Sequence, residues 1–149
     1  MLLTDIMKAK EKMDKVFADT NLFLRVFIPD DPGQTEAALR LFRQAAAGDF
    51  SLQTNVLVIA EIIWVLMSSY GASRAQIHEN ILGILNTPGV HVEHEAIITK
   101  ALDVFLHTNI DFIDAYSISW MQANHLSIAY TFDRRHFSRM PGIEVKVPD

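Results

Sequence analysis

The residues best suited to chemistry are carboxylates that stand far apart in the sequence: Asp19, Glu61, Asp114 and Asp133. Carboxylates repel one another when they gather, so a site that they share requires a cation. An all-oxygen set of ligands, with no cysteine in the chain and no suitably placed pair of histidines, selects a hard ion such as Mg²⁺ or Mn²⁺. The hypothesis holds only if the fold brings these acids to one place.

Asp19 ends the short apolar run 15–18 and is followed by Thr20 and Asn21. The run predicts a buried strand because it is brief, mostly apolar and bounded by polar residues. Ligands of an open parallel sheet bind beyond the carboxyl ends of its strands, which is where Asp19 stands. Thr20 and Asn21 could hydrogen-bond whatever the cation holds. The alternative is that Asp19 or Asn21 caps the helix that follows.

Glu61 is the one acid within the apolar stretch 56–67. A helix that is apolar all round is expected to be buried, and a carboxylate in it needs a partner or a function. An ion pair with an Arg or Lys is one interpretation, but we favour a metal or active-site role. The second turn of this helix lies near the same strand-end edge of the sheet as Asp19.

Asp114 and Asp133 are predicted at that edge as well. The helix that Asp114 begins must deliver the chain to the start of the strand at 128–132, so its own start lies at the carboxyl edge. Asp133 directly follows that strand, and Thr131 could hydrogen-bond nearby. Asp111 could face the same way, although we favour a role as the helix N-cap.

Strand and helix patterns alternate along the chain, which predicts a parallel sheet with right-handed crossovers and helices on both faces. Thr54 or Asn55 is expected to cap a helix that Gly71 ends, and Ser73 to begin the next. The predicted strands are 15–18, 50–53, 90–92, 128–132 and 144–147, and the predicted helices are 22–28, 34–47, 55–70, 73–85, 95–107 and 113–125.

The 149 residues, of which 50% are hydrophobic, suit one globular domain. We expect residues 13–149 to form this domain and residues 1–12 to be a peripheral leader. The N-terminus lacks the apolar core of a signal peptide, and the run 56–67 is too short to span a bilayer. The absence of cysteine fits a reducing compartment. These features predict a soluble, cytoplasmic protein.

The net charge of −5 argues against charge-driven adhesion to nucleic acid. It permits a nucleic-acid enzyme whose acids surround a metal, because a bound cation inverts the local charge. A candidate basic patch consists of Arg134, Arg135, His136 and Arg139, although paired arginines after a strand are most often a solvated face.

Several segments together resemble the PIN domain family, in particular the VapC-type toxins of bacterial toxin–antitoxin pairs. The resemblance runs from Asp14 to the C-terminus. It rests on Val16–Arg25, Asp30–Pro32, Ala38–Phe42, Ala60–Glu61, Asp111–Ala115 and Thr131–Phe137, which occur in the family's order.

The resemblance implies a three-layer sandwich with a central, mostly parallel sheet of four to five strands flanked by helices. It implies an Mg²⁺- or Mn²⁺-dependent endoribonuclease that uses one or two ions. Asp19, Glu61, Asp114 and Asp133 would form its acidic quartet. An RNA substrate, a cognate antitoxin and a homodimer would be its partners.

Supporting roles follow from the same resemblance for Thr20, Asn21 and Thr131. Independently of the resemblance, Arg134, Arg135 and Arg139 could hold flanking phosphates of the RNA, and Arg25 is a further candidate. Two alternatives stay open: a PIN-like DNA nuclease, and a non-catalytic module whose acids bind the basic segment of a partner.

Overall fold

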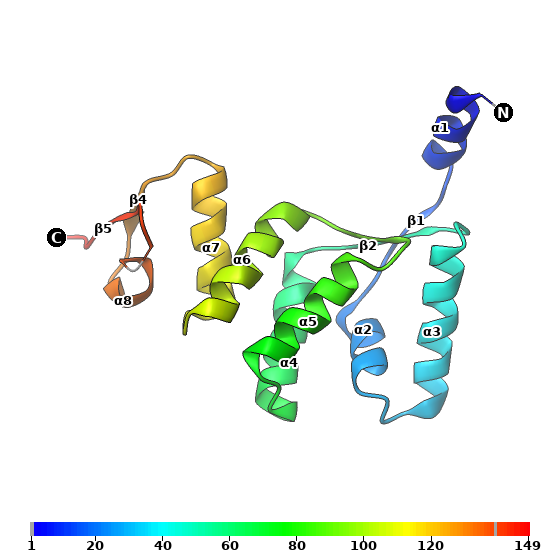
Figure 1. Cartoon of the computed structure of the whole chain (residues 1–149), viewed down its shortest axis with the longest axis horizontal. Helices are drawn as coiled ribbons and strands as arrows, with labels where there is room; N and C mark the ends of the chain where they lie inside the picture. Colours follow the sequence, from blue (N-terminus) through cyan, green and yellow to red (C-terminus); the bar gives the residue numbers. More distant parts are fainter. Residues whose placement is uncertain (1, 139) are drawn as a thin grey trace.

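A computed structural model describes residues 2–138 and 140–149 of the chain. Its elements alternate much as predicted (Figure 1). In chain order they are α1 (Leu3–Glu11), β1 (Lys15–Phe17), α2 (Thr20–Phe27), α3 (Pro32–Ala46), β2 (Ser51–Thr54), α4 (Val56–Tyr70), α5 (Arg74–Leu85), β3 (Val90–Val92), α6 (Glu95–His107), α7 (Phe112–Ala123), β4 (Ile128–Tyr130), α8 (Arg134–Phe137) and β5 (Glu144–Lys146).

The main sheet has the strand order β1-β2-β3, and both pairs are parallel. Val16 lies opposite Leu52, and Leu52 opposite Val90, so these side chains share one face of the sheet. Leu52 is 1% exposed and belongs to a core that helices from α2 to α7 complete. The predicted class, helices flanking a parallel sheet, is confirmed.

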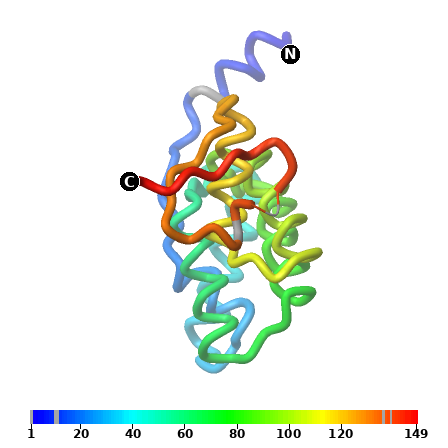
Figure 2. The backbone as a smooth tube through the Cα atoms, turned by 90° about the vertical axis from the view of Figure 1, so that its left-hand side faces the viewer, coloured from blue at the N-terminus to red at the C-terminus, as the bar shows by residue number. Residues whose placement is uncertain are grey.

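The five predicted strands form two separate sheets in the described structure and not the single sheet that was expected. β4 and β5 pair with each other in parallel and form a second sheet, with no link to β1 among the described residues. We call residues 128–149, which hold β4, α8 and β5, the C-terminal unit. Helices α6 and α7 separate this unit from β1 along the long axis of the molecule (Figure 1). Figure 2 looks onto the end at which the unit lies, with the unit in front.

A Schellman motif sets the direction in which the chain leaves α7. His125 adopts the left-handed conformation, with φ 58°. Its N–H donates to the carbonyl of Gln122 at 3.3 Å, and the N–H of Leu126 donates to that of Met121 at 2.8 Å. Phe137 and Ile143 of the C-terminal unit then pack against the core. The separation of the two sheets is therefore held by specific contacts.

The prediction that the first strand is buried is wrong for the single chain. All three residues of β1 are exposed, Val16 by 39% and Phe17 by 64%. The reason is that β1 pairs only with β2, so that its second edge has no neighbouring strand within the described residues.

The predicted caps of α4 are confirmed. The side chain of Asn55 accepts hydrogen bonds from the N–H groups of Leu57 and Val58 at 3.1 and 3.3 Å. Gly71 ends the helix in the left-handed conformation, with φ 64°. These local signals place the second turn of α4, and with it Glu61.

Helix α1 projects away from the rest of the chain, as Figures 1 and 2 show. Its apolar side chains are open to solvent, with Leu3 73% and Met7 58% exposed. No helix of the described residues is long and apolar enough to cross a bilayer.

We predict that Gly89→Ala lowers the free energy of unfolding by about 3 kcal/mol, from overpacking and backbone strain together. Gly89 has φ 81°, and a Cβ there would lie 2.3 Å from the carbonyl oxygen of Ala45 in α3. Urea unfolding would measure the loss. Gly83→Ala is the matched control, since a Cβ at this position of α5 meets nothing within 4 Å. It should raise the stability by up to about 1 kcal/mol, and an equal loss in both variants would contradict this account.

Candidate active site

Asp19 is held at the carboxyl end of β1 by contacts of the residue before it. Ala18 is fully buried, and its N–H donates to the carbonyl of Gln53 at 2.9 Å. Its own carbonyl accepts a hydrogen bond from the Thr54 hydroxyl at 3.0 Å. Asp19 takes the N-cap position of α2, but its side chain makes no capping hydrogen bond. The carboxylate is thus exposed and available at the strand end, so the capping alternative is not what the structure shows.

Thr20 connects this strand end to Glu61. The Thr20 side chain is buried, with 2% exposure, and its hydroxyl donates to the Glu61 Oε2 atom at 3.0 Å. This contact joins α2 to α4 and turns the Glu61 carboxylate toward the segment that carries Asp19. Asn21 is exposed in the first turn of α2 and does not cap it.

The predicted burial of Glu61 is wrong. Glu61 is exposed, together with Leu57 at 74% and Trp64 at 68%, which lie four residues before and three after it on the same face of α4. The sequence of α4 is apolar all round, but this face has no cover within the described chain. Glu61 therefore faces solvent and needs no buried countercharge.

Asp114 lies in the first turn of α7 and is half-buried. The start of that helix is clamped by Arg74, whose guanidinium donates to the carbonyls of Phe105 and Ile110, each at 2.8 Å. Asp111 occupies the predicted N-cap position without making a capping hydrogen bond. Its carboxylate instead lies 4.0 Å from Arg74 and is 79% exposed, so this ion pair is weak.

Asp133 stands apart from the other acids. It follows β4 as predicted, and its backbone N–H donates to the Thr131 hydroxyl at 3.0 Å. Its side chain caps α8 by accepting the N–H of Arg135 at 3.1 Å. Because β4 belongs to the second sheet, one chain does not bring Asp133 to the edge that Asp19 occupies. No three acidic or histidine residues of the described chain lie close enough together to hold a metal ion.

The donor atoms nevertheless suit a hard divalent cation. The carboxylate of Asp19 is exposed and not used in capping, and that of Glu61 accepts one hydrogen bond from within the described residues, that of Thr20. These are carboxylate oxygens, the ligands that Mg²⁺ and Mn²⁺ prefer. The single chain supplies the chemistry of such a site but only part of its geometry.

The candidate arginines differ in availability. Arg25 is engaged within the chain, because its Nη1 atom lies 2.6 Å from the Asp30 carboxylate. Arg134 and Arg135 are exposed on α8. Arg139 lies outside the described residues.

Polar residues that sequence reasoning missed line an open hollow of about 390 Å³ at the carboxyl ends of β2 and β3. Gln53, His91 and Glu93 contribute to it, beside Phe17 of β1. The sequence signal that could have found them is the one used for Asp19, a polar residue at the end of a predicted strand.

Burial, and then the charge of Glu93, raise the pKa of Tyr116 on α7. The phenol of Tyr116 is therefore neutral in the physiological range.

Residues 16–143 match the PIN domain family profile. The chain belongs to the PIN domain family. PIN domains are in general nucleases that depend on divalent metal ions. The acidic strand end of this PIN domain, by which we mean Asp19 at the end of β1 and the neighbouring Glu61, agrees with that class. The match begins within β1 and leaves α1 outside. A search of curated proteins found no similar sequence.

We predict that Thr20→Val slows phosphodiester cleavage by this PIN domain about tenfold or more, the cost typical of losing a residue that orients a metal ligand. The change removes the hydroxyl that holds Glu61 and keeps the side-chain volume. The melting temperature should fall little, since such a hydrogen bond contributes about 1 kcal/mol. Thr20→Ser, which keeps the hydroxyl, is the control. Equal rates in the two variants would show that the Thr20–Glu61 contact does not serve the site.

Proposed function

We propose that this PIN domain is a metal-dependent endoribonuclease and the toxin of a toxin–antitoxin pair. The observation that carries the proposal is the exposed Asp19 carboxylate, fixed at the end of β1, not used as a cap and adjacent to the Thr20–Glu61 hydrogen bond. The sequence resemblance to VapC-type toxins over Val16–Arg25 supports the choice of RNA and of the toxin role.

The roles of the residues follow from their chemistry. Asp19 and Asp114 would be the principal ligands of one or two Mg²⁺ or Mn²⁺ ions. When bound, such an ion lowers the pKa of a water and offsets the negative charge of the phosphate. Glu61, oriented by Thr20, would accept a hydrogen bond from the attacking water. Asp133 would complete the cluster.

Two further groups would hold the RNA. The Asn21 amide can donate to a phosphate oxygen, with Thr131 supporting the segment around Asp133. Arg134 and Arg135, exposed on α8, are the arginines available for flanking phosphates, whereas Arg25 would first have to leave Asp30.

The antitoxin would be a protein with a basic segment that occupies the acidic strand end. The exposed apolar face of α4, with Leu57 and Trp64, offers an adjacent surface for such a partner. The lack of cysteine agrees with action in the cytoplasm.

We predict that the purified protein cleaves RNA with Mg²⁺ or Mn²⁺ and loses this activity with chelator. Asp19→Asn should reduce the rate by about 100-fold or more, because changes to residues that only support metal ligands already cost about 10- to 100-fold. The measurement is cleavage of a mixed RNA pool, beside single- and double-stranded DNA of matched length.

Asp49→Asn is the matched control. Asp49 is an exposed acid just before β2, at the amino edge of the sheet, and its loss should leave the rate unchanged. Cleavage of DNA alone would replace the RNA proposal by a DNA nuclease. Metal binding without cleavage of either polymer would favour the non-catalytic module.

A further inference from the structure

Four strands each have one edge without a neighbouring strand in the described part of the chain: β1 and β3 in the main sheet, and β4 and β5 in the second sheet. Within the described residues, β1 pairs only with β2, and β4 pairs only with β5. An open edge presents a row of unpaired N–H and C=O groups, and proteins normally cover or shorten such edges. The open edges of β1 and β4 both belong to parallel sheets, which are ordinarily buried.

Of these four strands, β1 and β4 are the ones whose described residues include exposed large apolar side chains. On β1, Phe17 is 64% exposed. On and after β4, Ile128 is 46%, Tyr130 68% and Phe132 81% exposed. Side chains of this size gathered on edge strands indicate a surface that is covered in the functional protein. Both strands thus offer an unpaired backbone edge together with exposed apolar side chains.

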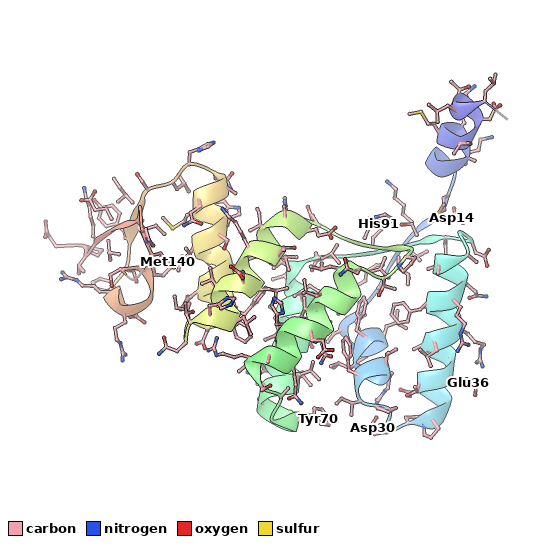
Figure 3. All side chains as sticks on the ribbon, in the orientation of Figure 1. Asp14, Asp30, Glu36, Tyr70, His91 and Met140 are labelled. Carbon is pink, nitrogen blue, oxygen red and sulfur yellow. The ribbon has the colours of Figure 1, made fainter. Side chains whose placement is uncertain are left out.

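Within one chain these two strands are kept apart. The Schellman motif at His125 directs the chain away from β1 as it leaves α7. Contacts of Phe137 and Ile143 with the core hold the C-terminal unit on the far side of α7. Figure 3 shows the result, with Met140 of the unit and Asp14, just before β1, toward opposite ends of the molecule. Pairing of the two strands in one chain would require these contacts to break.

We propose that two copies of the chain exchange their C-terminal units, so that β4 of each copy pairs with β1 of the other. In the proposed dimer β4 runs parallel to β1, the direction that every pair within the two sheets has, and the resulting sheet has the order β3-β2-β1-β4-β5. Association in this form needs no rearrangement of α7 or of its exit. A second copy is the occupant because it carries an open, apolar strand edge already in an accessible position.

The exchange completes the site, and in this respect it rests on the proposed function. Parallel pairing places the carboxyl ends of β1 and β4 at one edge of the sheet. Asp19 of one copy would then meet Asp133 and Thr131 of the other, with Arg134 and Arg135 close behind. Each of the two sites in the dimer would be built from both chains.

Cysteine cross-linking tests the pairing without reference to activity, and the absence of native cysteine makes each introduced thiol unique. Val16→Cys and Ala129→Cys place one thiol at the middle of β1 and one at the middle of β4. We expect the two single variants, refolded together and oxidised, to give a disulfide-linked dimer. Each single variant alone is the control and should stay uncross-linked.

The double variant Val16→Cys/Ala129→Cys distinguishes exchange from closure within one chain. Exchange gives a covalent dimer on a non-reducing gel, whereas closure gives an internally cross-linked monomer and overturns the proposal. Light scattering on the unmodified protein should give the mass of a dimer, and a monomer at micromolar concentration would overturn the proposal as well.

Activity adds a separate readout. Asp19→Asn and Asp133→Asn should each be inactive alone, and refolding them together should restore cleavage, since some mixed dimers combine an intact Asp19 with an intact Asp133 in one site. No restoration would overturn the shared site. A cross-linked dimer of the otherwise unchanged protein that cleaves no nucleic acid would refute the proposed function and leave the exchange standing.

Discussion

The position of Asp19 depends on hydrogen bonds between β1 and its neighbour β2. The buried Ala18 is fixed on both sides, by the Gln53 carbonyl and by the Thr54 hydroxyl. Asp19 is the first residue after Ala18, so the sheet fixes the point at which its side chain leaves the backbone, although the side chain itself is exposed. The same backbone leads directly into α2, where Thr20 reaches across to Glu61. A small number of main-chain contacts thus positions the chemistry of the whole strand end.

The other edge of β1 controls what that strand end can do. A carboxylate pair such as Asp19 and Glu61 supplies oxygen ligands, but tight binding of a divalent cation requires more ligands than these. Asp114 of α7 is one candidate for a further ligand, and Asp133, which follows β4, would be another only if that strand lay beside β1. In the proposed dimer, the covering of the apolar edge of β1 and the assembly of the cation site would be one event.

Local signals made most of the fold predictable from the sequence. The bounds of α4 followed from the Asn55 and Gly71 caps, and β3 and α6 begin and end where their patterns indicated. The positions of Asp19 and Asp114 relative to their elements were also predictable, because strand ends and first helical turns are local features. The short helix α8 was missed, since its four residues carry no periodic pattern.

Features that depend on contacts between distant parts of the sequence were harder to predict. Which strand lies beside β1 depends on the direction in which the chain leaves α7. That direction is set by His125 in the left-handed conformation, and the sequence gives no signal of it because the position is not a glycine. The exposure of Glu61 depends on whether any element covers the Leu57–Trp64 face of α4, which the apolar composition of that helix cannot reveal.

The separation of Asp133 from Asp19 within one chain also has a consequence for regulation. If the cation site needs two chains, the rate of cleavage at low concentration rises with the square of the amount of protein rather than in proportion to it. Newly made single copies would be almost harmless, and activity would begin only above a threshold set by the dissociation constant of the dimer. A nuclease built in this way would carry a delay of its own, independent of any inhibitor that binds it.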